Sequence, residues 1–336
     1  ITLGVKVLRY ILSALLAISG MKGHTTILTV KQDGSGDYAL IQDAVNASSD
    51  GDTVLAWPGR YYENVDFSGK NITLASLMLT TGDPAYKYNT IIDGNFSGSC
   101  VNIMSGETDA VLYGLSLQHG SGEIWASPMQ GLGGGINIAY ASCSIQYCDI
   151  SKNLTLGHGG GISIAFSPNT QLTGTSIHHN HSYTTGGGMF IGNSAVVHFD
   201  TINRCNLYEN YASQGCDLRV AIDDSLFIYL DTCTVLHPDR YFFSSTQEEG
   251  YEEDDIVYSI WNATITPKDA DLYVNPQTGD NSNSGLTPDD PLRTIAYAYS
   301  SIVVDSTDRN TIHLANGIYS DSANSEKFPL NIRPFV

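Results

Sequence analysis

Short runs of alternating apolar and polar residues recur along the chain and predict many β-strands. Three glycine triplets, at 133–135, 159–161 and 186–188, each lead directly into such a run. The runs are Ile136-Asn137-Ile138, Ile162-Ser163-Ile164 and Met189-Phe190-Ile191. In a strand the outer residues of each run face one side and the middle residue faces the other. No stretch after residue 20 keeps the 3.6-residue spacing of a long amphipathic helix, so the pattern predicts an all-β fold.

The glycine triplets belong to a repeat. They begin 26 and 27 residues apart, and a weaker fourth copy is expected at Gly215-Cys216, with Cys216 in the column of Ile136 and Met189. A second strand follows in each copy and an asparagine ends it. The matched residues are Ile145, Leu172 and Ile202, then Ile150, Ile177 and Leu207, and finally Asn153, Asn180 and Asn210.

One copy of the repeat cannot bury its apolar face alone. Stacked copies can, because each strand then pairs in parallel with its counterpart in the next coil and like residues lie above like. The pattern therefore predicts a right-handed parallel β-helix with Ile/Leu stacks inside and an asparagine ladder at one turn. The triplets are expected to supply positive φ at tight turns. A jelly roll or β-propeller would show hairpin signals, which are missing from the repeats.

A second pattern, a start module, occurs twice, over residues 30–61 and 272–319. Both copies read as strand, polar turn, short helix, strand and a Gly-x-Tyr turn. The helices are expected at 41–47 and 295–301, where each would cap the open end of a β-helix. The predicted organisation is a parallel β-helix at 27–240, an acidic linker or final coil at 241–270, and the N-terminal part of a second β-helix at 271–336, cut off by the chain end.

The first 19 residues resemble a secretory signal peptide, with basic Lys6 and Arg9, an apolar run from Tyr10 to Ile18 and small residues before Ser19. An ordinary first helix is the alternative. The run is too short to span a membrane. Because the chain begins with Ile and stops inside a start module, it is expected to be a fragment of a longer protein.

Composition narrows the choice of partners. The formal charge is −19, from 16 Lys and Arg against 35 Asp and Glu, which excludes nucleic acid and anionic lipid as natural partners. The six cysteines match no zinc pattern. Cys148 and Cys205 share a column two coils apart, about 9–10 Å, which is too far for a disulfide. Most of the cysteines are therefore predicted to be small buried apolar residues.

Two resemblances follow from these residues. The repeats (GGGISI…SIHHN and GGGMFI…NLYEN) resemble those of polymorphic outer membrane proteins, within the pectin lyase-like superfamily of β-helices. The second start module (DLYVNPQTGDNSNSGLTPDDPLRTIAYA) resembles the opening of β-helix domains in large secreted bacterial proteins. The resemblances imply a bacterial protein that is secreted or held at the outer membrane, and they imply no reaction.

The first start module also resembles the opening of pectin methylesterases, in VKQDGSGDYALIQDAVNA followed by PGRYYENV. Those enzymes carry their catalytic carboxylates further along, in Gln-Asp-Thr and Asp-Phe-Ile-Phe-Gly type motifs. Neither motif occurs here. The resemblance therefore implies a shared way of starting the β-helix, without ester hydrolysis.

Three places in the sequence resemble catalytic or metal-binding motifs. Gly157-His158-Gly159 is similar to a polygalacturonase motif, but the acidic pair Asp223-Asp224 lies downstream of it, so His158 is interpreted as a turn residue. His178, His179 and His181 form the densest histidine cluster. Adjacent histidines seldom converge on one metal, so a solvated turn is predicted there.

The Asp-rich turns at 33–37 and 280–285 superficially resemble calcium loops, and both occupy the same place in the start module. A turn role explains them, and calcium is the one cofactor left as an alternative. Few basic residues lie in the repeats to serve a lyase: Lys152, Arg204 and Arg219. The sequence thus identifies no catalytic and no metal-binding residue.

The leading hypothesis is a monomeric, non-catalytic, adhesin-like protein that binds a glycan or a partner surface. The alternative is a polysaccharide lyase or glycoside hydrolase acting on an extended, even acidic, polysaccharide. An enzyme should place a cluster of carboxylates with His, Lys or Arg on one outward face. A binding protein should expose aromatic residues such as Tyr140 or Phe190 without that cluster.

Overall fold

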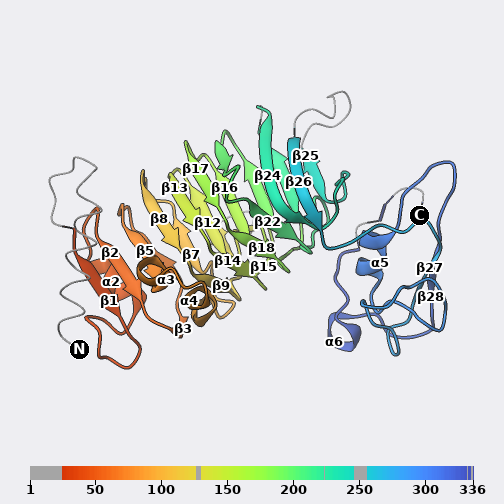
Figure 1. Cartoon of the computed structure of the whole chain (residues 1–336), viewed down its shortest axis with the longest axis horizontal. Helices are drawn as coiled ribbons and strands as arrows, with labels where there is room; N and C mark the ends of the chain where they lie inside the picture. Colours follow the sequence, from red (N-terminus) through yellow and green to blue (C-terminus); the bar gives the residue numbers. More distant parts are fainter. Residues whose placement is uncertain (1–24, 126–129, 223, 246–255, 331, 334–335) are drawn as a thin grey trace.

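The computed structural model describes residues 25–125, 130–222, 224–245, 256–330, 332–333 and 336, so the expected signal peptide lies outside the described residues. These residues form a right-handed parallel β-helix followed by a smaller second module (Figure 1). Three parallel sheets of seven, seven and eight strands run along the β-helix. The predicted fold class is confirmed. No helix among the described residues is long and apolar enough to cross a membrane.

The strands of each sheet are given in their spatial order. Sheet 1 holds β1 (Ile27–Val30), β2 (Thr53–Ala56), β5 (Thr73–Ser76), β8 (Ala110–Tyr113), β13 (Cys143–Gln146), β17 (Thr170–Thr173) and β21 (Val197–Phe199). Sheet 2 holds β4 (Val65–Asp66), β7 (Val101–Ile103), β12 (Ile136–Ala139), β16 (Ile162–Ala165), β20 (Met189–Gly192), β23 (Leu218–Ala221) and β25 (Phe243–Ser245). Sheet 3 holds β3 (Gly59–Tyr62), β6 (Thr90–Asp93), β9 (Ser116–Gln118), β14 (Asp149–Ser151), β18 (Ser176–His178), β22 (Cys205–Tyr208), β24 (Leu226–Cys233) and β26 (Ile256–Ala263).

Three two-stranded sheets and five helices complete the described secondary structure. The strand pairs are antiparallel β10 (Glu123–Trp125) and β11 (Gln130–Leu132), then parallel β15 (Leu154–Thr155) with β19 (His181–Ser182) and β27 (Leu272–Val274) with β28 (Ile312–Leu314). The helices are α2 (Ile41–Ala47), α3 (Met78–Thr81), α4 (Ala85–Asn89), α5 (Ile295–Ser301) and α6 (Asp321–Asn324). The predicted capping helices are α2 and α5, with the expected bounds. Because β25 and β26 pair with β23 and β24, the strands of the β-helix continue to Ala263.

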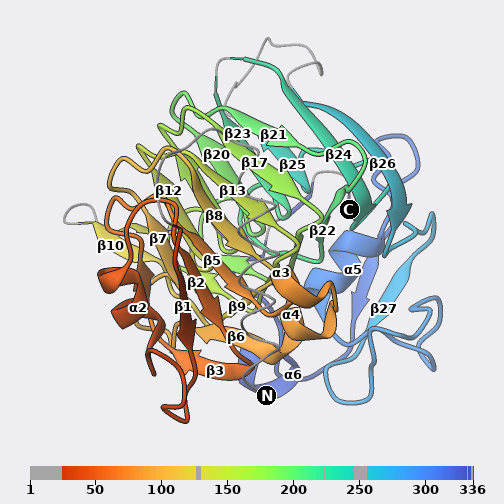
Figure 2. The ribbon, with the colours of Figure 1, turned by 60° about the vertical axis from the view of Figure 1, so that its left-hand side comes forward.

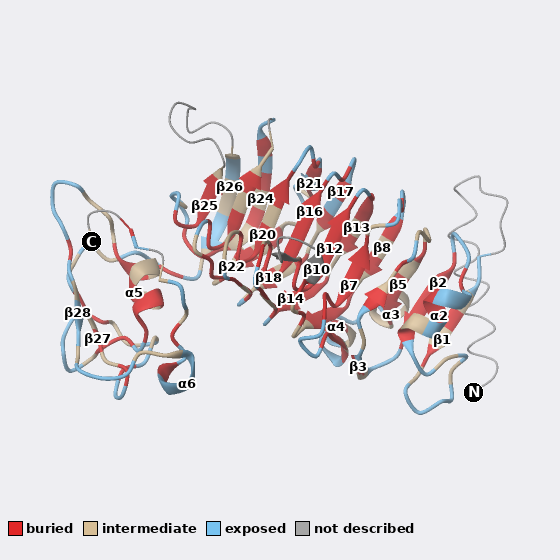
Figure 3. Ribbon diagram, turned by 180° about the vertical axis from the view of Figure 1, so that it is seen from behind, coloured by how far each residue is buried: buried red, intermediate tan, exposed pale blue. Residues whose placement is uncertain are grey.

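In each sheet, inward-facing apolar side chains of successive coils form columns with one residue per coil. These columns make up the core (Figure 3). In sheet 2 the paired residues Val101, Ile136, Ile162, Met189, Leu218 and Phe243 follow one another, all of them buried. The prediction that like residues stack on like is confirmed. All six cysteines are buried and free, so the predictions that most are buried and that Cys148 and Cys205 are not bridged are confirmed, and burial raises the pKa of the Cys100 thiol to about 12.

Two positions in the predicted alignment are wrong. Leu218, not Cys216, pairs with Met189, and Phe199, not Ile202, pairs with Leu172. Ile202 is 82% exposed in a loop. Both errors follow from extra residues in the turns of the later coils, since the asparagines at 180 and 210 are 30 residues apart whereas those at 153 and 180 are 27 apart.

The asparagine ladder forms as predicted, and it explains the glycine triplets. Asn153 Nδ2 donates to Asn180 Oδ1 at 2.9 Å, and Asn180 Nδ2 donates to Asn210 Oδ1 at 3.0 Å. Only the first glycine of each triplet has positive φ, for example Gly159 at 70°. A side chain on the third glycine would strike the ladder, because a Cβ on Gly161 would lie 2.9 Å from Asn180 Nδ2. The glycine triplets are therefore needed for close packing against the asparagine ladder as well as for the tight turns.

The two start modules share the same hydrogen bonds. Tyr61 Oη donates to Val30 O and Trp57 O, and Tyr319 Oη donates to Val274 O and Ala315 O. A carboxylate then caps each helix. Glu63 accepts from the backbone N–H groups of Ile41 and Gln42 at 2.9 and 2.8 Å, and Glu326 accepts from those of Ile295 and Ala296 at 2.7 and 2.9 Å.

Candidate functional site

The outward face of sheet 3 carries the densest group of charged and aromatic side chains in the β-helix. Its inward column includes Ile92, Ile150 and Ile177, so the residues on either side of these point outward. Because the sheet is parallel and in register, outward residues of successive coils lie about 4.8 Å apart. One outward column contains Tyr62 beside Asp93, Asp93 beside Gln118, and then Ser151, His178 and Tyr208.

A first cluster surrounds Asp93, whose side chain is almost fully buried. Its Oδ2 accepts from Arg60 Nη1 and bonds His119 Nδ1 at 2.9 Å, and its Oδ1 accepts from the Asn95 backbone. Burial acts to raise the pKa of Asp93, but the bonds from His119, Asn95 and Arg60 outweigh it and lower that pKa. The His119 ring packs against Phe96 with centroids 5.2 Å apart, and Phe96 is 56% exposed.

A second cluster is a chain of four side chains running from Asp149 to Glu209. His178 Nε2 lies 3.0 Å from Asp149 Oδ1, His178 Nδ1 lies 2.8 Å from His179 Nδ1, and His179 Nε2 lies 3.0 Å from Glu209 Oε2. Burial acts to raise the pKa of Asp149, but His178 and Ser151 lower it overall. The bond from His179 lowers the pKa of Glu209 against a smaller opposing effect of burial.

Contacts within the chain occupy both histidine rings. Every ring nitrogen of His178 and His179 is already bonded within the chain. Neither ring has a free nitrogen to act as a base on a ligand, so this cluster is suited to a structural role at the surface.

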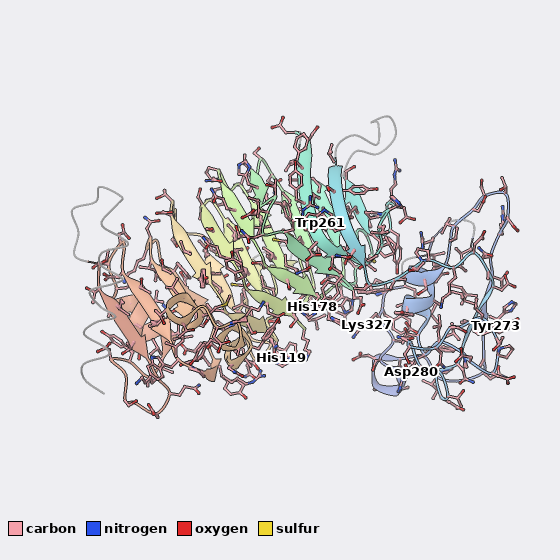
Figure 4. The ribbon with its side chains drawn as sticks, viewed as in Figure 1. His119, His178, Trp261, Tyr273, Asp280 and Lys327 are labelled. Carbon is pink, nitrogen blue, oxygen red and sulfur yellow. The ribbon has the colours of Figure 1, made fainter. Side chains whose placement is uncertain are left out.

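Aromatic rings flank the second cluster. Tyr208 stacks on His178 with centroids 4.9 Å apart and planes 4° from parallel. Helix α4, inserted between β5 and β6, brings Tyr88 and Lys87 to the same face, where the Lys87 ammonium lies 4.8 Å from the Tyr88 ring. Ser116 Oγ donates to Lys87 O at 2.9 Å and so ties α4 to β9. Figure 4 shows His119 and His178 along one side of the β-helix, and Figure 2 shows α3 and α4 beside β6 and β9.

A third aromatic group lies on the last strands of sheet 3. The Arg204 guanidinium lies 3.9 Å from the ring centre of Trp261, and Trp261 is 58% exposed. Arg204 Nη1 also donates to Ser259 O at 2.9 Å, which fixes its orientation. The Arg204 guanidinium also lies 5.6 Å from the ring centre of Tyr229. Aromatic side chains thus occur at intervals along the outward face of sheet 3, from Tyr62 to Trp261.

The histidines singled out in the sequence lie in three different settings. His158 forms isolated β-bridges with Leu132 and Thr185, and its ring bonds Thr185 Oγ1 at 2.7 Å and stacks on Phe190 at 4.7 Å. His178 and His179 belong to the second cluster. His181 differs from the predicted solvated turn, because burial, followed by the nearby Lys327 charge, lowers its pKa to about 4.

The Asp-rich turns use their carboxylates locally. Asp33 Oδ1 accepts from Ser35 N at 2.9 Å, and Asp280 Oδ1 accepts from Ser282 N at 2.8 Å. These are Asx turns, which explain both loops without a cation. Within the described residues, no group of three or more His, Cys, Asp or Glu side chains is arranged to hold a metal ion.

Of the two expected aromatics, Tyr140 is exposed and Phe190 is half-buried. Tyr140 stacks on Phe166 with centroids 4.7 Å apart, and both have positive φ at the same turn of successive coils. A separate cleft of about 300 Å³ lies where sheet 1 ends, with His198 and Asp224 at its rim and Phe199 and Leu226 among its apolar lining. The cleft is also lined by Tyr229 of β24, the ring that lies near Arg204.

The residues missed from the sequence are Arg60, Lys87, Asp93, Asp149 and Glu209. The repeat alignment already placed Ile150 and Ile177 inward, so it could have shown that Asp149 and His178 share an outward face. Arg60 and Lys87 gave no such signal, because the first coils lack the glycine triplet and α4 is an insertion.

Three comparisons with known proteins were made. A family model described as a protein of unknown function (DUF1565) matches residues 277–336, within the second module. The structure is similar to pectin methylesterase from carrot, at 16% identity and a TM-score of 0.38, over 72% of this chain and 84% of that one. It is also similar to deglycosylated pectin methylesterase from Aspergillus niger, at 13% identity and a TM-score of 0.31, over 72% and 87% of the two chains. A search of curated proteins gave no match.

Proposed function

We propose that this chain is a non-catalytic protein that binds an extended glycan along the outward face of sheet 3. The observation that carries the proposal is that exposed or partly exposed rings, such as Tyr62, Tyr208 and Trp261, lie on one face of sheet 3 beside internally bonded polar groups. Sugars suit such a face, since their hydroxyl groups both donate and accept hydrogen bonds and their apolar faces pack on aromatic rings. From Tyr62 to Tyr208 the column crosses five strand spacings of about 4.8 Å, roughly 24 Å in all.

The proposed cellular location and the charge of the ligand are inferred from the sequence. A bacterial protein that is exported, then secreted or held at the cell surface, would meet such glycans, and the net charge of −19 disfavours nucleic acid. The two sheet 3 clusters carry little net charge, because Arg60 and Lys87 oppose the three carboxylates Asp93, Asp149 and Glu209. A neutral glycan is therefore the preferred ligand. The proposal needs no cofactor and no second copy of the chain.

The binding prediction is tested with Tyr208→Ala, which removes the ring that covers His178. We expect the intact chain to be retained on at least one immobilised neutral polysaccharide, and the variant to bind the matching oligosaccharide at least about tenfold more weakly in calorimetry. The matched control is Tyr113→Ala, because Tyr113 lies on the outward side of sheet 1 against Tyr147. Equal losses in both variants, or no retention on any polysaccharide, would contradict the proposal.

One observation favours the alternative of a polysaccharide lyase or glycoside hydrolase. Lys87 is buried, and within the described residues no carboxylate lies at ion-pair distance from its ammonium group. A desolvated amine beside a glycan is a candidate base. The same polysaccharides incubated with the chain, with new reducing ends and unsaturated products measured, separate the two functions. Products that disappear in Lys87→Met would establish the enzyme and overturn the non-catalytic reading.

A further inference from the structure

Helix α5 has two apolar faces, and each belongs to a different core. Ile295, Ala298 and Ile302 at its C-terminal end pack with Leu272 and Val274 inside the second module. On the other side, Ala296 packs into the core of the first β-helix, and Tyr297 and Tyr299 pack against both cores. An open β-helix end exposes its core, so a solenoid needs a cap at both ends. Helix α5 therefore begins the second module and also closes the first β-helix.

A polar seam surrounds this apolar contact. Tyr211 Oη donates to Pro329 O at 2.6 Å. Arg333 donates to Tyr299 O and Ile302 O at 2.8 and 3.1 Å, and it forms an ion pair with Asp239 of the first β-helix. The Arg333 guanidinium also lies 5.1 Å from the Tyr241 ring centre. The seam thus joins Tyr211 and Asp239 of the last coils to Pro329 and Arg333 of the second module.

His181 lies at one edge of the seam. Its ring packs between Tyr183 and Tyr211, with centroids 4.8 and 5.2 Å away. The second module presents Lys327 and Asp321 toward it, a pair that lies 3.5 Å apart, and the backbone of Phe328. Figure 4 shows Lys327 where the second module approaches the β-helix. Tyr211 contacts both His181 and Pro329, so the histidine and the polar seam share this residue.

We propose that residues 271–336 form the C-terminal cap of the first β-helix, and that protonation of His181 weakens the attachment of this cap in acid. The cap lies against a half-buried, uncharged histidine ring beside a lysine, and the ring's Nε2 is fully buried. An imidazolium there would lack water and would face the Lys327 ammonium. Separation of the seam returns the ring to solvent, where it accepts a proton freely, so acid favours the separated state.

The size of the effect follows from proton linkage. The His181 pKa falls from 6.5 to about 4, first through burial and then through Lys327, while the Phe328 backbone and Asp321 oppose the shift. A base whose folded pKa is depressed contributes stability above pH 6.5 that is lost as the pH falls toward 4. Between pH 7 and pH 5 the equilibrium for opening the seam should rise about 20-fold.

Hydrogen exchange of the full chain tests the proposal. The readout is the protection of the last-coil amides at 216–218 and 241–245, corrected for intrinsic exchange rates at each pH. We expect protection to fall about 20-fold from pH 7 to pH 5 in the natural chain, and to fall far less in His181→Gln. The control is His313→Gln, an exposed histidine paired with Asp271 in the second module, which should behave as the natural chain does.

Two results would overturn the proposal. Protection of the last coil that is equal at pH 7 and pH 5 in the natural chain would show that acid does not loosen the seam. A fall that persists in His181→Gln would assign the effect to another group. Arg333→Gln tests the cap itself: it should lower protection of the same amides at both pH values and leave those of β1 and β2 unchanged.

Discussion

Replacing Asn180 with alanine is expected to lower the free energy of unfolding by roughly 3–5 kcal/mol, among the largest effects of any single change in the β-helix. Asn180 is 1% exposed and bonds in both directions along the ladder. Its Oδ1 accepts from the backbone and side-chain nitrogens of Asn153, while its Nδ2 donates to Asn210 Oδ1 and to Ile150 O at 2.8 Å. Alanine would leave several buried polar groups unpaired where water cannot reach them.

Urea unfolding followed by circular dichroism measures this loss. The control is Gln171→Ala, which removes a side-chain amide from an exposed outward position of β17 one strand away and should change stability by less than about 0.5 kcal/mol. A loss in Asn180→Ala no greater than in the control would show that the ladder does not stabilise the coils. Gly161→Ala should also destabilise, since its Cβ would press on Gly188 O at 2.6 Å and on the ladder.

The sequence predicted the fold well because its strongest signals are local and periodic. The triplet that opens each coil and the asparagine that closes it were recognised at Gly159, Asn180 and their equivalents, and the inward columns followed from alternation. The two errors at Cys216 and Ile202 came from counting a fixed period across turns that had gained residues. In a β-helix such residues bulge into a loop without disturbing the strand, so register follows the paired strands and not the residue count.

The clusters on sheet 3 were harder to predict for a different reason. The chain from Asp149 to Glu209 joins three coils, and its members lie up to 60 residues apart in sequence. Each of them alone is an ordinary polar residue next to an inward apolar one. Lys87 comes from an inserted helix that follows no repeat, so only the structure shows which coil it covers. The cluster that was expected of an enzyme is present, yet its histidines are bonded to each other, which sequence reasoning could not foresee.

The last prediction concerns the end of the asparagine ladder. After Asn210 the next position is Asp217, which accepts from Asn210 N and Nδ2 at 3.1 and 3.0 Å and is fully buried. Burial raises the pKa of Asp217 to about 7, although bonds from Thr234 and Asn210 act to lower it. The folded chain therefore holds a proton on Asp217 at pH values where the unfolded chain, with a pKa near 3.8, has released it.

The sign of the pH dependence follows directly. A group whose pKa is raised on folding contributes its full stabilisation of the folded state below the pKa that it has in the unfolded chain. For Asp217 that contribution disappears as the pH rises to about 7. The shift corresponds to an upper bound of about 4 kcal/mol. Asp217→Asn keeps the oxygen that accepts from Asn210 and never ionises, so it should be more stable than the natural chain by up to a few kcal/mol at pH 8 and close to it at pH 4.

Thermal and urea unfolding of both proteins at several pH values would measure this difference. Asp224→Asn is the control, because Asp224 is exposed at the rim of the cleft beside sheet 1 and its replacement should leave the pH profile unchanged. His181 acts in the opposite direction below pH 6.5, but it is present in all three proteins and cancels in the comparison. If Asp217→Asn and the natural chain lose stability in parallel from pH 4 to 8, Asp217 is ionised in the core and a compensating partner must hold it there.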